Sequence, residues 1–321
     1  YIQGGQGGRD RAEIREQDGS FRLLTGFSTQ DLEDAYPRIF LAPDGGVFGF
    51  SHRQMFRIDP AGDGSRTDFG DISRVAPTWH TPSVMSEPGR ILVAGGADNR
   101  AAIVDIRGDQ PTITSAGSIS GRRLWSNATV LADGSVALTG GSANDNELRS
   151  AAYQVELFNP RTLTWTQGPS AQRARLYHSI SMLLPDGSML TGGGGAPGPQ
   201  VNTNVEVYYP PYLFDAEGAP KARPILSGAP TVLDPSAAFA LRSPDAARIS
   251  RLTLVATGSV THSFDSNQRF MELPFYRDGE DGLRGQLPVN PYDTPPGYYM
   301  LFAFDDSGTP SMARIIRIQP S

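Results

Sequence analysis

The sequence predicts an all-β protein in which a kelch-type β-propeller is followed by a small β-sandwich. Helical periodicity is nearly absent over 321 residues, and glycine and proline are abundant, at 36 and 26 residues. Short apolar runs end repeatedly in glycine pairs, a pattern typical of many short strands joined by tight turns. The pattern recurs at about 45 residues, which is the period of a four-stranded kelch or WD propeller blade.

Glycines at strand ends mark the repeat. They fall at Gly4-Gly5, Gly49, Gly95-Gly96, Gly140-Gly141 and Gly192-Gly193. Each repeat reads as strand, turn, strand, glycine pair, loop and a further strand, such as 154–160 or 205–210. A glycine pair favours kelch, because glycine permits close strand approach and positive φ. Four repeats and a partial first one are visible. A closed ring usually has six or seven blades, so we expect the first blades to precede Tyr1.

A different pattern begins after the repeats, which stop near residues 212–214. A proline-rich linker runs from Pro220 to Pro230. Alternating strands follow at 238–241, 251–255, 298–304 and 313–318. Short strands over about 90–100 residues indicate a small β-sandwich. We therefore divide the chain into a partial propeller, 1–219, and a C-terminal sandwich, 220–321.

Composition excludes several classes of function. The net charge is −6, from 28 basic and 34 acidic residues, with no basic run or stripe, which argues against a nucleic-acid partner. The sequence has no cysteine, so disulfides, thiolate metal sites and cysteine nucleophiles are excluded within it. No segment approaches the ~18 apolar residues of a membrane span. No signal peptide is visible, and we expect the sequence to be a mature or truncated product.

Three separated side chains offer metal-binding chemistry. Tyr177 and His178 stand directly before the predicted strand and turn at 179–187, and His262 lies in the second region. A phenolate and two imidazoles can form a copper site. Adjacent residues of a regular strand point to opposite faces, so Tyr177 and His178 could share a metal only from an irregular strand entrance. The plainer alternative is a tyrosine and a histidine at a blade edge and a loop histidine in the sandwich.

Other candidate chemistry is weaker. We expect His52 to be a turn residue. His80, which follows Trp79, could face the propeller pore, although a blade edge is the stronger expectation. Acidic residues form no obvious carboxylate dyad, and no Gly-x-Ser-x-Gly elbow supports a serine hydrolase. The glycine run 192–195 lacks the following Lys-Ser or Lys-Thr of a phosphate loop.

Several ordered motifs together resemble the galactose oxidase and glyoxal oxidase family of copper-radical oxidases. The motifs are 177–187 with the glycine run after it, Thr261-His262 with Gln268-Arg269, 295–302 and 308–311. The resemblance extends from about Tyr177 to the C-terminus and is looser upstream. It implies a seven-bladed kelch propeller capped by an immunoglobulin-like domain. A loop of that domain would carry His262 down the propeller axis.

The resemblance also implies a copper site. Tyr177 would be the axial phenol ligand and would take the proton of the substrate hydroxyl, while His178 and His262 would be equatorial ligands. In the family a second tyrosine, cross-linked to a cysteine, holds a radical and removes hydrogen from the substrate carbon. Oxygen then reoxidises the centre and hydrogen peroxide is released. Tyr153 lies where members of the family often place a substrate-facing aromatic residue.

The sequence departs from the family pattern in three places. It has no cysteine, so we expect the Tyr-Cys radical cofactor upstream of Tyr1, or on a companion N-terminal fragment that completes the propeller. The position of the aromatic residue that stacks over the cross-link holds Gly7. The family's cysteine pair after the glycine run is replaced by 196–199, Ala-Pro-Gly-Pro.

Three functions remain open. The first is a secreted or cell-surface copper-radical oxidase that acts with O2 on a primary alcohol, aldehyde or carbohydrate. The second is a non-catalytic kelch propeller that binds glycan or protein through its blade loops. The third is a copper-binding relative without the radical cofactor. Fold alone does not decide among them; a cysteine and a tyrosine upstream would favour the first.

Overall fold

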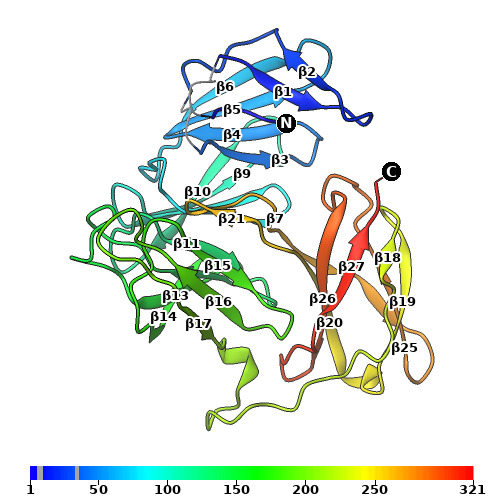
Figure 1. The fold of residues 1–321 in the computed structure, drawn as a ribbon. Helices are drawn as coiled ribbons and strands as arrows, with labels where there is room; N and C mark the ends of the chain where they lie inside the picture. The colour runs from blue at the N-terminus through cyan, green and yellow to red at the C-terminus, as the bar shows by residue number, and fades with distance from the viewer. Residues whose placement is uncertain (6–9, 33–35, 321) are drawn as a thin grey trace.

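The structure, a computed structural model, describes residues 1–5, 10–32 and 36–320. The architecture is all-β, as predicted (Figure 1). The helical segments in these ranges are two short 3-10 turns, η1 (Pro211–Leu213) and η2 (Ala246–Arg248). Within the same ranges, no helix has the length and apolar character needed to cross a membrane.

Four antiparallel sheets follow one another along the chain, and we name them blades A to D. Each is a simple meander, because its strands pair in sequence order. Blade A holds β3 (Arg38–Leu41), β4 (Val47–Ser51), β5 (Gln54–Asp59) and β6 (Ser65–Asp71). Blade B holds β7 (Ser83–Glu87), β8 (Arg90–Ala94), β9 (Arg100–Asp105) and β10 (Thr112–Ser118). Blade C holds β11 (Asn127–Val130), β12 (Val136–Thr139), β13 (Gln154–Asn159) and β14 (Thr164–Ser170).

Blade D has three strands in the described chain, β15 (Ser179–Leu183), β16 (Met189–Gly193) and β17 (Val205–Tyr208). A hairpin of β1 (Ala12–Arg15) and β2 (Phe21–Leu24) precedes blade A. The four-strand repeat expected from the glycine spacing is therefore present. A ring of seven blades stays a prediction.

The glycine pairs have the conformation that the repeat requires. Gly95 and Gly96 have φ of 78° and 107°, and Gly140 and Gly141 have φ of 66° and 84°. A Cβ atom on Gly96 would lie 2.6 Å from the carbonyl oxygen of Ala76, too close for any other residue. In blade C the pair lets the next blade approach, since the Gly141 amide donates to the carbonyl of Arg175 at 2.6 Å. This contact holds the entrance of blade D, just before Tyr177, against blade C.

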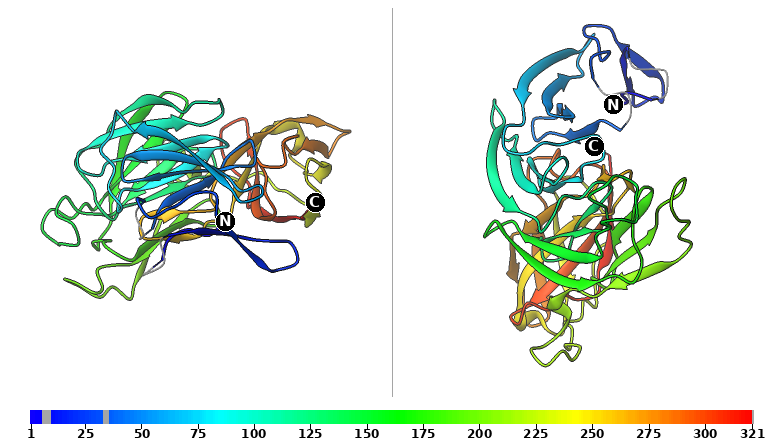
Figure 2. Two further views of the ribbon diagram at one scale, coloured as in Figure 1. Left: turned by 90° about the horizontal axis from the view of Figure 1, so that it is seen from above. Right: turned by 90° about the vertical axis from the view of Figure 1, so that its left-hand side faces the viewer.

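The C-terminal region is built from two facing sheets (Figures 1 and 2). One has the order β18 (Val232–Leu233), β27 (Arg314–Ile318), β26 (Gly297–Asp305), β20 (Ile249–Ala256), β23 (Phe270–Leu273). The other has the order β19 (Ala238–Arg242), β25 (Gly282–Gln286), β24 (Phe275–Arg277). Side chains of both, such as Leu241, Leu254, Leu283 and Leu301, bury one apolar core, as in a β-sandwich. The four strands predicted from alternation all lie within these sheets.

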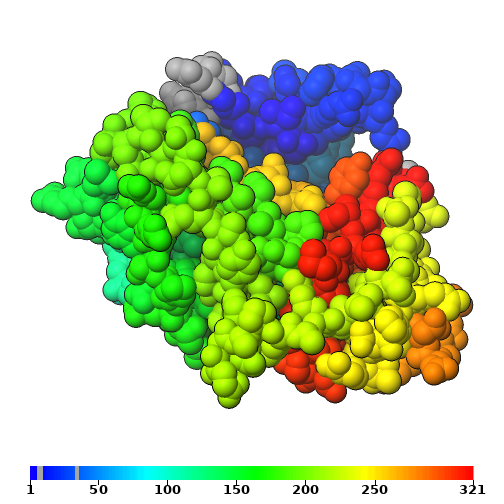
Figure 3. All heavy atoms as spheres, turned by 60° about the horizontal axis from the view of Figure 1, so that its bottom comes forward, coloured from blue at the N-terminus to red at the C-terminus, as the bar shows by residue number. Residues whose placement is uncertain are grey.

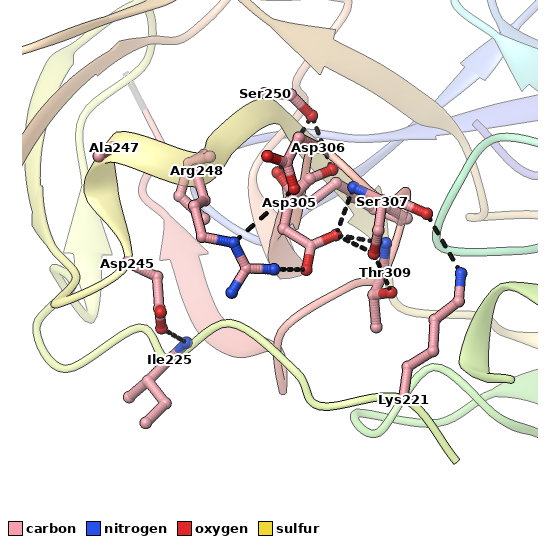
Figure 4. Close-up of polar contacts among 12 residues, drawn as sticks. Lys221, Ile225, Asp245, Ala247, Arg248, Ser250, Asp305, Asp306, Ser307 and Thr309 are labelled. Carbon is pink, nitrogen blue, oxygen red and sulfur yellow. Dashed lines mark hydrogen bonds and ion pairs between the residues drawn. The ribbon is translucent and has the colours of Figure 1, made fainter. Parts of the chain in front are cut away.

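A buried carboxylate organises the turn that follows β26 (Figure 4). Asp305 is 1% exposed. Its Oδ1 accepts hydrogen bonds from the Ser307 amide at 3.0 Å, the Ser307 hydroxyl at 2.7 Å and the Thr309 amide at 2.9 Å. Its Oδ2 pairs with Arg248 Nη2 at 2.8 Å. Lys221 in the linker donates to the Ser307 carbonyl at 3.1 Å, so the same turn also receives the linker.

A hairpin of the C-terminal region joins blade B. Its strands β21 (Val260–Thr261) and β22 (Phe264–Asp265) extend the blade to the order β10-β9-β8-β7-β22-β21, with Phe264 paired in parallel with Ser83. The space-filling view shows this part of the chain, in gold, between blue blade A and the green blades (Figure 3). Gln268 fastens it to blade C, since its amide group bonds both the N–H and the carbonyl of Val130, at 2.8 and 2.9 Å.

Candidate metal centre

Tyr177 and His178 lie at an irregular strand entrance, immediately before β15. His178 has a left-handed backbone with φ of 64°, which breaks the alternation of a regular strand. The two rings consequently stack on the same side, with centroids 3.7 Å apart. The condition for a shared metal, that this segment should not be a regular strand, is met.

His262 occupies the tip of the hairpin between β21 and β22. His262 and Ser263 have φ of 49° and 64°, so the two-residue turn has positive φ at both central positions. Such a type I′ turn normally contains Asn-Gly or Gly-Gly. A left-handed backbone costs a residue with a Cβ atom roughly 1–2 kcal/mol, and strain of this kind is found mainly at functional sites.

The structure brings together the three predicted ligands, Tyr177, His178 and His262. His178 Nε2 and His262 Nε2 are 2.8 Å apart, although the residues are separated by 84 positions. The Tyr177 ring lies 5.4 Å from the His262 ring. No group of three or more His, Cys, Asp or Glu side chains could hold a metal within the described ranges. The Tyr177 phenol is the further side chain that the sequence predicted as a ligand beside the two imidazoles.

Protonation and spacing of the two imidazoles suit a metal ion. His178 Nδ1 lies 2.8 Å from the carbonyl of Ala196 and must donate to it, which leaves Nε2 as a bare lone pair. Burial, with the nearby His178 and Arg38, lowers the pKa of His262 to about 4, so this ring is neutral at pH 7. Two nitrogens about 2.0 Å from one ion and at right angles lie about 2.8 Å apart. The observed separation of the Nε2 atoms matches this value, so the residues fit copper.

Aromatic side chains from the other blades surround the three candidate ligands. Tyr36 stacks on His262 with ring centroids 3.7 Å apart, and Trp125 lies 4.4 Å from Tyr177. Trp79 stands 4.8 Å from Trp125, edge to face. Sequence reasoning missed these contacts, yet a signal was present, because an aromatic residue precedes the first strand of each of blades A to D. The repeat itself thus places one ring per blade at the centre.

The remaining histidines, His80 and His52, lie in different surroundings. His80 contacts the same cluster, with its ring 4.8 Å from that of Trp125; whether it faces the pore or a blade edge stays a prediction. His52 lies in the turn between β4 and β5, as predicted. Burial raises the pKa of the Tyr177 phenol, and the electrostatic effect of the nearby Tyr36 phenol raises it further.

Tyr153 lies away from these residues. It lines a cleft of about 350 Å³ between blades C and D, together with Arg173 and Tyr209. The cleft lining does not include Tyr177, His178 or His262, and a substrate role for Tyr153 stays a prediction. Gly7 lies outside the described residues.

Comparison with known proteins agrees with this arrangement. Residues 223–318 match the family described as "Galactose oxidase-like, Early set domain". This part of the chain is a galactose oxidase-like Early set domain. Galactose oxidase of Gibberella zeae is 30% identical over 246 residues, which cover 72% of this chain and 36% of that protein. Aldehyde oxidase GLOX of Vitis pseudoreticulata is 25% identical over 347 residues, which cover 93% of this chain and 65% of that protein.

The chain also has a structural counterpart among solved structures. It matches the solved structure of a "novel fungal alcohol oxidase with catalytic diversity among the AA5 family, in complex with copper", with a TM-score of 0.88. The match covers 97% of this chain and 70% of that one at 23% identity, and it establishes the fold. The chain spans about a third of the galactose oxidase and about two thirds of the aldehyde oxidase.

Proposed function

We propose that this chain provides the copper site of an oxidase that converts a primary alcohol or aldehyde with O2 and releases H2O2. One observation carries the proposal. Two imidazoles from different domains present Nε2 atoms 2.8 Å apart beside the Tyr177 phenol. The names of the similar proteins, galactose oxidase and aldehyde oxidase, support the substrate class.

Each side chain has a distinct role in this proposal. His178 and His262 hold the copper, which when bound supplies one-electron redox chemistry. Tyr177 would complete the ligand set as a phenolate, and its Oη would then accept the proton of the substrate hydroxyl. The indole of Trp125 packs against Tyr177 and limits the access of water to that oxygen.

The overall reaction requires a second electron carrier. An alcohol that becomes an aldehyde loses two electrons and two protons, which O2 takes up as H2O2. Cu(II) would accept one of these electrons, so we infer that a cross-linked Tyr-Cys radical would accept the other before both pass to O2. The sequence contains no cysteine. The cofactor would therefore lie on sequence upstream of Tyr1 or on a companion fragment, and the enzyme would be secreted or at the cell surface.

A copper-binding relative without the radical cofactor is the second candidate, and the absence of cysteine favours it. Such a protein would bind copper at the same three residues and release no peroxide. A non-catalytic propeller for glycan or protein would need no such convergence of imidazoles.

Copper binding and peroxide release separate these candidates. We expect the chain to bind one Cu(II) by calorimetry, and His178→Ala and His262→Ala to weaken that binding at least 100-fold. Unchanged copper affinity in both variants would refute the site. Peroxide release is then measured on alcohols and aldehydes with the protein joined to its upstream sequence. Copper binding without peroxide would favour the relative that lacks the radical.

A further inference from the structure

A short segment at the entrance of blade A, Tyr36-Pro37-Arg38, contacts the hairpin tip that carries His262. We call this set of contacts the grip. The Tyr36 ring lies on the His262 ring at 3.7 Å with only 16° between the planes. Arg38 is the first residue of β3, and its Nη2 donates to the carbonyl of His262 at 3.1 Å. One side chain therefore holds the imidazole face, and the other holds the backbone of the same residue.

Arg38 ties the hairpin to two blades at once. Its Nη2 also donates to the carbonyls of Trp79 at 2.7 Å and Thr81 at 3.1 Å, on the segment that leads into blade B. The guanidinium lies 5.2 Å over the ring of Phe264, which follows the hairpin turn. Arg38 is only 2% exposed, and burying a charge is costly unless its hydrogen bonds are made. The hairpin supplies the His262 carbonyl as a further acceptor beside those of Trp79 and Thr81.

Tyr36 meets the hairpin tip with a strained backbone. Its backbone is left-handed, with φ of 54°, although a following proline disfavours helical conformations for the residue before it. Backbone strain of this kind is found mainly at functional sites. The Tyr36 ring stacks on one candidate ligand, His262, which the C-terminal region carries.

We propose that Tyr36 and Arg38 are positioning residues that set the location of His262 relative to His178 and Tyr177. The proposal rests on the proposed copper site. The hairpin turn is strained and short, so without this grip its tip would lose the 2.8 Å approach between the two Nε2 atoms. Positioning groups around a metal site typically change metal affinity 10–100-fold when they are removed.

The chain contains a matched control for Arg38. Arg277 also donates to three backbone carbonyls, those of Ala246, Ala247 and Ile249, at 3.0, 3.0 and 2.9 Å. It lies within the sandwich, away from the hairpin. Arg38→Lys and Arg277→Lys therefore remove the same kind of multiple bonding while keeping the charge. For the ring, Tyr36→Ala removes the stack and Tyr36→Phe retains it.

Two measurements test the grip. In the copper-free protein, hydrogen exchange of residues 257–268 should become at least tenfold faster in Arg38→Lys and Tyr36→Ala. It should stay within twofold of the parent in Arg277→Lys and Tyr36→Phe. Calorimetry with Cu(II) alone should show 10–100-fold weaker binding in the first two variants. The electron paramagnetic resonance spectrum of bound Cu(II) should change with them.

Unchanged exchange and unchanged copper affinity in Arg38→Lys and Tyr36→Ala would overturn the proposal, as would an equal loss in Arg277→Lys. Should Arg38→Lys fail to fold, Tyr36→Ala decides, because its side chain is exposed. His178→Ala distinguishes the two levels of argument. If His178→Ala keeps full copper affinity, the proposed copper site is refuted. The hydrogen-exchange rates alone then test whether Tyr36 and Arg38 position the hairpin.

Discussion

Asp305 is predicted to be one of the most sensitive positions for stability in the sandwich. Asp305→Ala removes the acceptor for two backbone amides and a hydroxyl, and leaves Arg248 without its partner (Figure 4). A buried donor left without an acceptor costs about 1–3 kcal/mol. With two amides affected and water able to reach one of them, we expect the free energy of unfolding to fall by about 2–5 kcal/mol.

Asp305→Asn separates the two oxygens of this carboxylate. The amide oxygen can keep the three bonds of Oδ1, and only the pair with Arg248 is lost. Arg248 is half exposed, so the ion pair is partly screened by water. Its loss should lower the free energy of unfolding by about 1 kcal/mol or less. Asp306→Ala is the matched control. Its carboxylate is largely exposed and lies 3.7 Å from Arg248, and we expect a change within about 0.5 kcal/mol.

Urea unfolding followed by far-UV circular dichroism measures these differences as shifts in the transition midpoint. The expected order of destabilisation is Asp305→Ala, then Asp305→Asn, then Asp306→Ala. An equal loss in Asp305→Ala and Asp305→Asn would refute the assignment of the stabilising role to Oδ1. A loss below about 1 kcal/mol in Asp305→Ala would refute the burial argument itself.

Three further predictions concern the blades and the site. Cu(II) at 100 times the dissociation constant of the parent should stabilise the parent by about 2.7 kcal/mol and His178→Ala by about 0.4 kcal/mol or less, as read from thermal unfolding. Glu156→Ala strands the buried Arg123, 2.7 Å away, and should cost about 3–5 kcal/mol in urea unfolding; a loss below 1 kcal/mol would contradict this. Burial raises the pKa of Asp265 above its ordinary 3.8, so its ionisation lowers stability as pH rises through the raised value. Asp265→Asn should remove that dependence, and an unchanged pH profile of unfolding would contradict it.

Much of the fold could be predicted because glycine leaves a local signature. The pairs at Gly95-Gly96 and Gly140-Gly141 require positive φ and close approach, and both needs are visible in the sequence. The meeting of His178 with His262 was predicted through family resemblance. The residue spacing alone left it open, since 84 positions of chain separate them.

The surroundings of the site could not be predicted in the same way. Tyr36 and Arg38 flank a proline at the start of an ordinary strand, and nothing local shows that they face a hairpin of another domain. Their partners are the ring and the carbonyl of a residue more than 220 positions away, and a backbone carbonyl has no sequence signature. His80 was placed at a blade edge for the same reason, because its neighbours come from other blades.

The pairing of β22 with β7 also sets an order for folding. Phe264 pairs with Ser83, and at roughly 5–20 residues per second the ribosome needs about 10–35 s to synthesise the chain between them. During that interval the inner edge of blade B has no partner strand, which makes it a site for pairing with other chains. The hairpin that carries His262 therefore supplies the last strands added to that blade. The imidazole pair can form only after β22 has paired with β7 at this edge.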